Sequence, residues 1–185
     1  MKKILMFAMI ALVAVSAMAD TGWYSDYVVV SVDGGADAYY WIGDDPSFGT
    51  QFDGADFGIV STLEIGADMR YWSDTADRDG GAMYWVTDGG TTPNEVIWTQ
   101  TYLGGNDYQG LVDSTTDVAD GLGDGAHTVS VWAKSWGTGQ GDSWLDNGGS
   151  NYTADFEVST IPEPATMSLL GLGALAMVLR RKTRK

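Results

Sequence analysis

One short acidic segment is the first place in this chain where side chains could bind a metal ion. Asp74, Asp77 and Asp79 stand close together and are followed by Gly80-Gly81. Carboxylate oxygens on a flexible loop are the ligands that Ca²⁺ takes. The spacing differs from the D-x-[DN]-x-[DN]-G pattern and lacks a bidentate Glu after it, so a plain Asp-rich turn is favoured. A Ca²⁺ site at the three aspartates is the alternative, and no other cofactor is indicated.

Tryptophan and tyrosine are the second group of residues that could bind a ligand, since the chain contains 8 Trp and 9 Tyr. Strand alternation predicts that Trp72, Trp132 and Trp136 face solvent on one side of the domain. Exposed rings stack on the apolar faces of sugars while carboxylates bond the hydroxyls, so these three residues are a candidate glycan-binding strip. The favoured alternative is that loops cover these rings or that they form the edge of the core.

The residues needed for catalysis are sparse. His127 is the only histidine, Cys is absent and no G-x-S-x-G motif occurs, which argues against acyl transfer by a nucleophile triad. Carboxylate pairs for glycoside hydrolysis exist in any sequence so rich in Asp, so they carry no specific signal. We therefore predict a protein that is not an enzyme and has no catalytic residues.

The charge of the central domain limits its partners. Of the 25 acidic residues only Glu163 lies outside residues 20–160, and of the 10 basic residues only Arg70, Arg78 and Lys134 lie inside, which gives the domain a net charge of −21. Without a basic patch, nucleic acid and anionic lipid surfaces are poor partners. Solubility in a saline habitat explains the charge better than a specific cationic ligand does. The lack of Cys excludes disulfides, so stability must come from the core.

Strands must position these residues, and the domain has a strand pattern throughout. The clearest example is 63–71, whose odd positions are apolar and even positions polar. Asp33-Gly34-Gly35 predicts a hairpin turn, and no convincing helical period occurs. The pattern predicts an all-β domain, an antiparallel β-sandwich of about seven to nine strands. The predicted strands are 27–32, 38–42, 63–71, 82–87, 95–103, 127–136 and 152–158.

The last two of these strands carry a loose resemblance to known domains. Residues 125–134 followed by 151–158 look like the final strands of an Ig-like or fibronectin-III-like bacterial surface domain. The resemblance implies a sandwich and implies nothing about a ligand.

The two ends of the chain have the patterns of processing signals. Lys2-Lys3, an apolar run from Ile4 to Val15 and the small residues Ala17 and Ala19 predict a signal peptide over residues 1–19. Signal peptidase and the secretory translocon are the partners that such a peptide requires. The domain then covers residues 20–160, and the remaining 161–185 form a C-terminal signal.

The C-terminal signal has three parts in a fixed order. Pro162-Glu163-Pro164 is followed by an apolar stretch, 165–179, and by a basic tail that contains half of all Lys and Arg in the chain. The stretch covers about 22 Å as a helix and spans a bilayer if flanking cations snorkel and the bilayer thins. The tail predicts a cytoplasmic C-terminus by the positive-inside rule.

This arrangement resembles the PEP-CTERM sorting signal of Gram-negative bacteria. The resemblance implies that a membrane protease-transpeptidase, exosortase, is a partner and that such proteins associate with exopolysaccharide. Its recognition residues here would be Pro162, Glu163, Pro164, Arg180, Arg181 and Lys182. The implied course is an inner-membrane intermediate held by the C-terminal helix, and then the cell surface, outer membrane or extracellular matrix.

Three hypotheses for the exported domain follow from these patterns. The first is a structural or adhesive protein of the surface or matrix. The second is a carbohydrate-binding module acting on exopolysaccharide, and the third and least favoured is a glycoside-active enzyme. Exposure of Trp72, Trp132 and Trp136 separates the first two.

Overall fold

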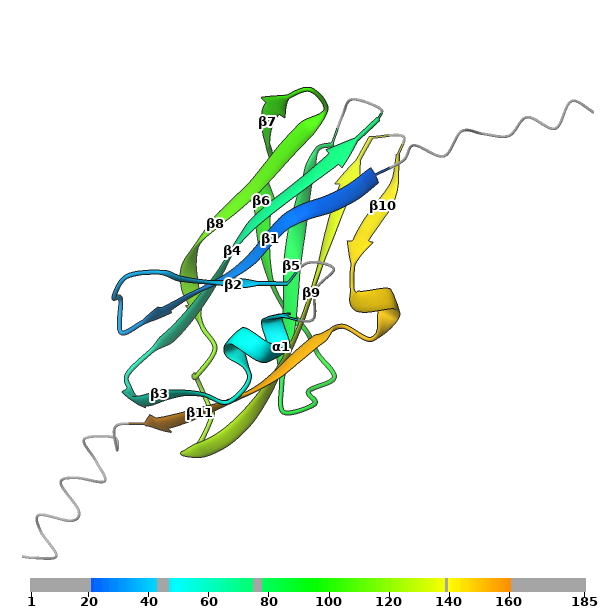
Figure 1. Ribbon diagram of the computed structural model, residues 1–185. Helices are drawn as coiled ribbons and strands as arrows, with labels where there is room; N and C mark the ends of the chain where they lie inside the picture. The colour runs from blue at the N-terminus through cyan, green and yellow to red at the C-terminus, as the bar shows by residue number, and fades with distance from the viewer. Residues whose placement is uncertain (1–20, 43–46, 75–77, 139, 161–185) are drawn as a thin grey trace, which may run out of the picture.

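The structure is a computed structural model that describes residues 21–42, 47–74, 78–138 and 140–160. These residues form two β-sheets that face each other (Figure 1). The first sheet contains, in spatial order, β2 (Ala38–Trp41), β1 (Thr21–Val32), β4 (Leu63–Ser73), β8 (Asp107–Asp117) and β7 (Thr101–Gly104). The second contains β3 (Ala55–Val60), β11 (Tyr152–Thr160), β9 (Gly125–Gly137), β5 (Gly80–Thr87) and β6 (Asn94–Thr99), with β10 (Gln140–Leu145) also paired to β9.

The predicted all-β class and two-sheet arrangement are confirmed. The described strand pairs are antiparallel except for β3, which runs parallel to β11. The described residues form 11 strands, more than predicted, because β3, β8 and β10 were missed and the predicted strand 95–103 is two strands. β8 and β10 are rich in Asp, Ser and Gly, residues that have weak strand propensity. Tertiary pairing outweighs this weak propensity, since β8 pairs with β4 and β7 and β10 pairs with β9. The resemblance to Ig-like domains stays a prediction.

The core lies between the sheets and follows the predicted alternation. Leu63, Ile65, Ala67, Met69 and Tyr71 of β4 are all at most 3% exposed. On the facing sheet, β11 buries every second residue from Tyr152 to Val158. A period of two sends alternate side chains to opposite faces, and burial of one face stabilises that register.

The domain contains a short helix, α1 (Ser47–Phe52), in a segment where the sequence shows no convincing helical period. Phe48 and Phe52 are buried and their rings stack with centroids 5.2 Å apart. Phe52 also meets Phe156 of β11 at 5.8 Å. The helix has six residues, which is too short for a helical period to appear in the sequence, and its apolar ring contacts with the sandwich hold it in place.

The predicted strand 95–103 is two strands in different sheets. β6 pairs with β5 in the second sheet, and β7 pairs with β8 in the first. The chain crosses between sheets at Gln100, whose Oε1 accepts a hydrogen bond of 2.7 Å from the Tyr71 hydroxyl. The sequence gives no sign of this crossing, because no Gly or Pro interrupts residues 95–103.

His127 has a structural role at the start of β9. Its Nδ1 lies 2.8 Å from Asp88 Oδ2, and its Nε2 lies 2.8 Å from the carbonyl oxygen of Gly123. Two oxygen acceptors require two N–H donors, which only the imidazolium supplies. The hydrogen bond to Asp88 therefore raises the pKa of His127, and the Gly123 carbonyl adds to this effect.

We expect this contact to make folding mildly pH-dependent. Because the pKa of His127 is higher in the folded state, its contribution is complete below the unfolded value of 6.5 and is lost as pH rises through the folded value. Denaturant unfolding should show stability falling by less than about 1 kcal/mol between about pH 6 and pH 8.5. His127→Gln should remove this slope, and an unchanged slope would contradict the assignment.

Candidate functional site

The three predicted tryptophans do not lie on one side of the domain. Trp72 belongs to β4 of the first sheet, whereas Trp132 and Trp136 belong to β9 of the second. All three are partly exposed and alternate with buried neighbours, as predicted. The single strip is wrong because the outer faces of two packed sheets point in opposite directions. Alternation determines whether a residue faces in or out, but not the sheet to which it belongs.

Trp132 and Trp136 share their face with residues that the sequence did not single out. We call this group the aromatic face, and it consists of Tyr84, Trp132, Lys134, Trp136 and Trp144. Tyr84 lies directly opposite Trp132 on β5, and their rings stack with centroids 5.7 Å apart and an interplanar angle of 16°. Trp144 lies opposite Lys134 on β10 and is 48% exposed. The face thus draws on three adjacent strands.

Lys134 organises one half of the aromatic face. Its Nζ lies 5.4 Å from the ring centroid of Trp136 and 5.1 Å from that of Trp144. Asp142 Oδ2 is 3.4 Å from the same nitrogen. An ammonium over an indole ring is attracted by the ring quadrupole. The cation therefore holds two indoles in fixed positions, which lowers the entropic cost of binding a ligand there.

Tyr84 keeps its hydroxyl protonated in this setting. Burial raises the pKa of Tyr84, while Lys134 acts in the opposite direction and Glu95 raises the pKa further. The neutral phenol is a hydrogen-bond donor and acceptor. An apolar ring surface bordered by a phenol, an ammonium and carboxylates has the chemistry that sugar rings require. Trp144 was missed in the sequence because its Gly- and Asp-rich flanks hide the strand β10.

The predicted Ca²⁺ ligands are only partly covered by the structure. Asp74 and Asp79 are exposed, and Asp77 lies outside the described residues. Asp79 Oδ2 accepts a hydrogen bond of 2.7 Å from the Thr138 hydroxyl, so this carboxylate supports the neighbouring loop. In the described part of the chain, no three His, Asp or Glu residues gather as a metal site would need. The Ca²⁺ site stays a prediction.

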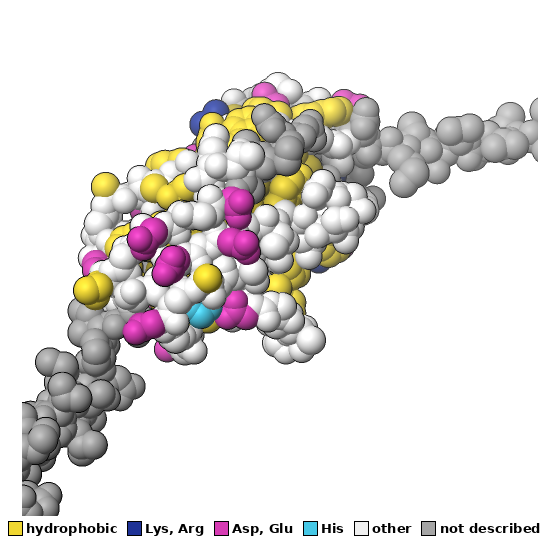
Figure 2. All heavy atoms as spheres, turned by 60° about the horizontal axis from the view of Figure 1, so that its bottom comes forward, with side chains coloured by type: hydrophobic (Ala, Val, Ile, Leu, Met, Phe, Trp, Pro, Cys, Tyr) yellow, Lys and Arg dark blue, Asp and Glu magenta, His cyan; other side chains and the backbone are white. Residues whose placement is uncertain are grey.

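Acidic residues occur along the whole domain sequence. Figure 2 shows Asp and Glu side chains around the histidine, without Lys or Arg among them in that view. Diffuse like charge keeps a protein soluble and responds to salt through screening.

The predicted sorting residues, 162–164 and 180–182, lie outside the described residues. A comparison with protein families matches residues 160–182 to the PEP-CTERM protein-sorting motif. The chain ends in a PEP-CTERM sorting signal. A comparison with curated proteins finds no match. The signal implies an exported protein that exosortase sorts and that a C-terminal membrane anchor holds before processing.

The PEP-CTERM motif begins where the sandwich ends. Its first matched residue, Thr160, is also the last residue of β11, and Pro162 follows two residues later. Within the described residues no helix could cross a membrane, and the predicted span at 165–179 lies outside them.

The two ends of the described domain lie far apart. β1 begins at one end of the sandwich and β11 finishes at the opposite end (Figure 1). The PEP-CTERM motif therefore joins the domain at the end remote from Thr21.

Proposed function

We propose that this protein is a structural or adhesive component of the cell surface or extracellular matrix, without catalytic activity. The observation that carries the proposal is the PEP-CTERM motif at residues 160–182, directly after β11. A sandwich with a core drawn from both sheets suits a surface component, because burial of that core can stabilise the domain without disulfides. The strongly acidic composition adds solubility outside the cell.

A second candidate function is carbohydrate binding on exopolysaccharide. The specific observation in its favour is the aromatic face, where Lys134 holds Trp136 and Trp144 and where Tyr84 stacks on Trp132. Adhesion to a polysaccharide would be the mechanism by which a surface protein contributes to a matrix. The two functions are therefore compatible, and the second is a refinement of the first.

Processing at the Pro-Glu-Pro element tests the leading proposal. The full chain should be exported, shortened at its C-terminus and recovered in the surface or matrix fraction of a host that contains exosortase. Replacing Pro162, Glu163 and Pro164 together with Ala should leave a full-length precursor in the inner membrane. Fractionation followed by mass spectrometry of the C-terminal peptide measures both outcomes.

The control variant is Pro93→Ala, which removes an exposed proline from the domain and leaves the motif intact. It should be processed like the wild type. Normal processing of the triple variant would refute recognition at this element. Wild-type protein that is shed entirely into the medium would refute a role in the surface or matrix.

A further inference from the structure

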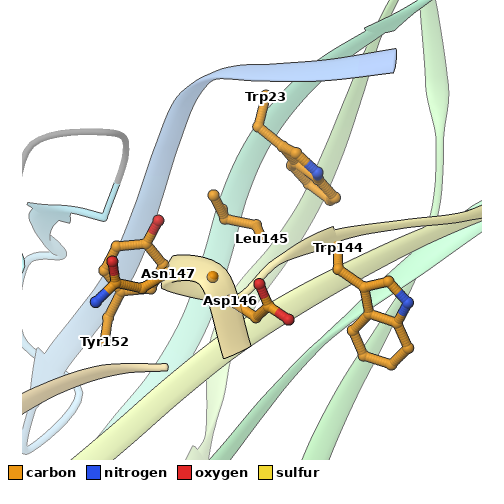
Figure 3. Close-up of a pocket in the computed structure, with 7 residues that line it drawn as sticks. Trp23, Trp144, Leu145, Asp146, Asn147 and Tyr152 are labelled. Atoms are coloured by element: carbon orange, nitrogen blue, oxygen red, sulfur yellow. The ribbon is translucent and has the colours of Figure 1, made fainter. Parts of the chain in front are cut away.

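A groove with a volume of about 420 Å³ lies at one edge of the sandwich, beside the aromatic face. It runs between the start of β1 and the connection from β10 to β11, which contains the short 3₁₀ helix η1 (Asn147–Gly149). Figure 3 shows Trp23 reaching from β1 toward Leu145, with Trp144 and Asp146 on one side and Asn147 and Tyr152 on the other. Two sheets thus contribute to one site.

The β1 wall is anchored to the opposite sheet by polar contacts. The Thr21 hydroxyl and Trp23 Nε1 both donate hydrogen bonds to Ser143 Oγ, at 3.0 Å and 3.2 Å. The ring of Trp23 also packs on Tyr71, with centroids 5.0 Å apart. These contacts keep Trp23 in position before any ligand arrives.

The η1 wall is built from a tight turn with unusual backbone angles. Asn147, Gly148 and Gly149 have φ values of 50°, 66° and 88°. The carbonyl oxygen of Asp146 accepts hydrogen bonds from the backbone N–H groups of Gly149 and Asn151, at 3.0 Å and 2.8 Å. Gly adopts positive φ at no steric cost and Asn tolerates it, so these residues suit the turn, and the two hydrogen bonds to Asp146 hold its shape. The turn is therefore a fixed part of the groove.

The side chains that line the groove combine flat rings with polar groups. Trp23 and Trp144 offer ring surface, and Tyr152 adds an aromatic floor that is 8% exposed. The Asp146 side chain makes no capping hydrogen bond to η1, so its carboxylate remains available to a ligand. Rings bind the C–H face of a sugar while carboxylate and amide groups bind its hydroxyls. The volume is within the usual range for small-ligand sites, roughly 300–1,000 Å³.

We propose that this groove binds a neutral sugar unit of a polysaccharide. The proposal rests on the carbohydrate-binding function and gives that function a site. A neutral sugar is favoured over an acidic one because Asp146 lines the groove and the domain carries a net charge of −21. Trp144 borders both the groove and the aromatic face, so a longer glycan can continue from the groove across Trp144 toward Trp136.

The groove is placed to work while the protein is still attached to the membrane. β11 begins at Tyr152 in the groove and ends at Thr160, where the PEP-CTERM motif starts. Eight residue steps at roughly 3.3 Å each separate the groove from the motif by about 26 Å. The sandwich thus holds the groove away from the anchored end.

Binding assays on the full chain in detergent test this proposal. The probes are hexasaccharides of glucose, galactose and mannose, with an oligogalacturonate of equal length as the acidic comparison, measured by calorimetry. We expect at least one neutral hexasaccharide to bind. Asp146→Ala should weaken it about tenfold, and Asn147→Gly should weaken it measurably while the left-handed backbone is kept. Melting temperatures near the wild-type value show that these variants stay folded.

Tyr39→Ala is the matched control, because Tyr39 is an exposed ring on β2 of the first sheet and belongs neither to the groove nor to the aromatic face. Its affinity should stay within about twofold of the wild type, whereas Trp144→Ala should lose about tenfold. A further variant, Trp132→Ala, distinguishes the two sites. Loss of binding in Trp132→Ala but in no groove variant would place the sugar on the aromatic face and overturn the groove proposal, while carbohydrate binding would stand. Failure of the wild type to bind any neutral probe would overturn both, and tighter binding of the galacturonate would overturn the preference for neutral sugars.

Discussion

Gly110→Ala is expected to destabilise the domain by about 3 kcal/mol, or roughly 10 °C in melting temperature. Trp98 of β6 is 3% exposed and its indole fills the space between Gly81 of β5 and Gly110 of β8. A Cβ on Gly110 would overlap Nε1, Cδ1 and Cε2 of that ring. The ring has no room to retreat, since a Cβ on Gly81 would meet its opposite edge. The overlap must then separate the two sheets or displace the ring.

Denaturant unfolding of the purified protein measures this effect. Gly123→Ala is the matched control, because a Cβ there meets no atom within 4 Å, and it should change stability by less than about 0.5 kcal/mol. Combining Gly110→Ala with Trp98→Phe should cost less than the sum of the two single changes, because the smaller ring leaves room for the methyl group. A fully additive pair, or a stable Gly110→Ala, would show that the indole does not occupy this space.

Neutralising the basic tail is expected to abolish the retention of the precursor in the inner membrane. Replacing Arg180, Arg181, Lys182, Arg184 and Lys185 with Gln removes half of the basic residues in the chain. At roughly 1 kcal/mol for each cation near an anionic leaflet, the five together contribute about 5 kcal/mol to orientation. A short apolar stretch has little other means of holding its position, so most of the precursor should leave the membrane or escape processing.

Fractionation and protease protection of a C-terminal tag measure the orientation of the tail. The control replaces Arg180, Arg181 and Arg184 with Lys, which retains every charge and changes the guanidinium groups. It should be retained like the wild type if charge is what matters. Retention of the Gln variant at the wild-type level would show that the cations do not hold the tail, and loss of the Lys variant would show that exosortase reads arginine itself.

Local pattern was sufficient to predict the sorting motif and the buried face of the clearest strands. The sorting motif at 160–182 consists of consecutive residues, so no folding is needed to recognise it. The residues of β4 and β11 that face the core were also predicted, because side-chain alternation can be recognised within a single strand. By contrast, α1 was missed because a helix of six residues completes too few turns to show a period.

The sequence by itself determined the sorting motif, the acidic charge and which side chains of the clearest strands face inward. Only the tertiary structure decided which strands share a sheet, and this decision placed Trp72 apart from Trp132 and Trp136. The same holds for the groove, which is lined by Trp23 from the start of the domain sequence and by Trp144 and Tyr152 from near its end. Strand pairing joins residues that are distant along the chain, and its selectivity comes from the burial and hydrogen bonding of the whole sandwich. No local pattern carries that information, so the site could be assembled only from the folded molecule.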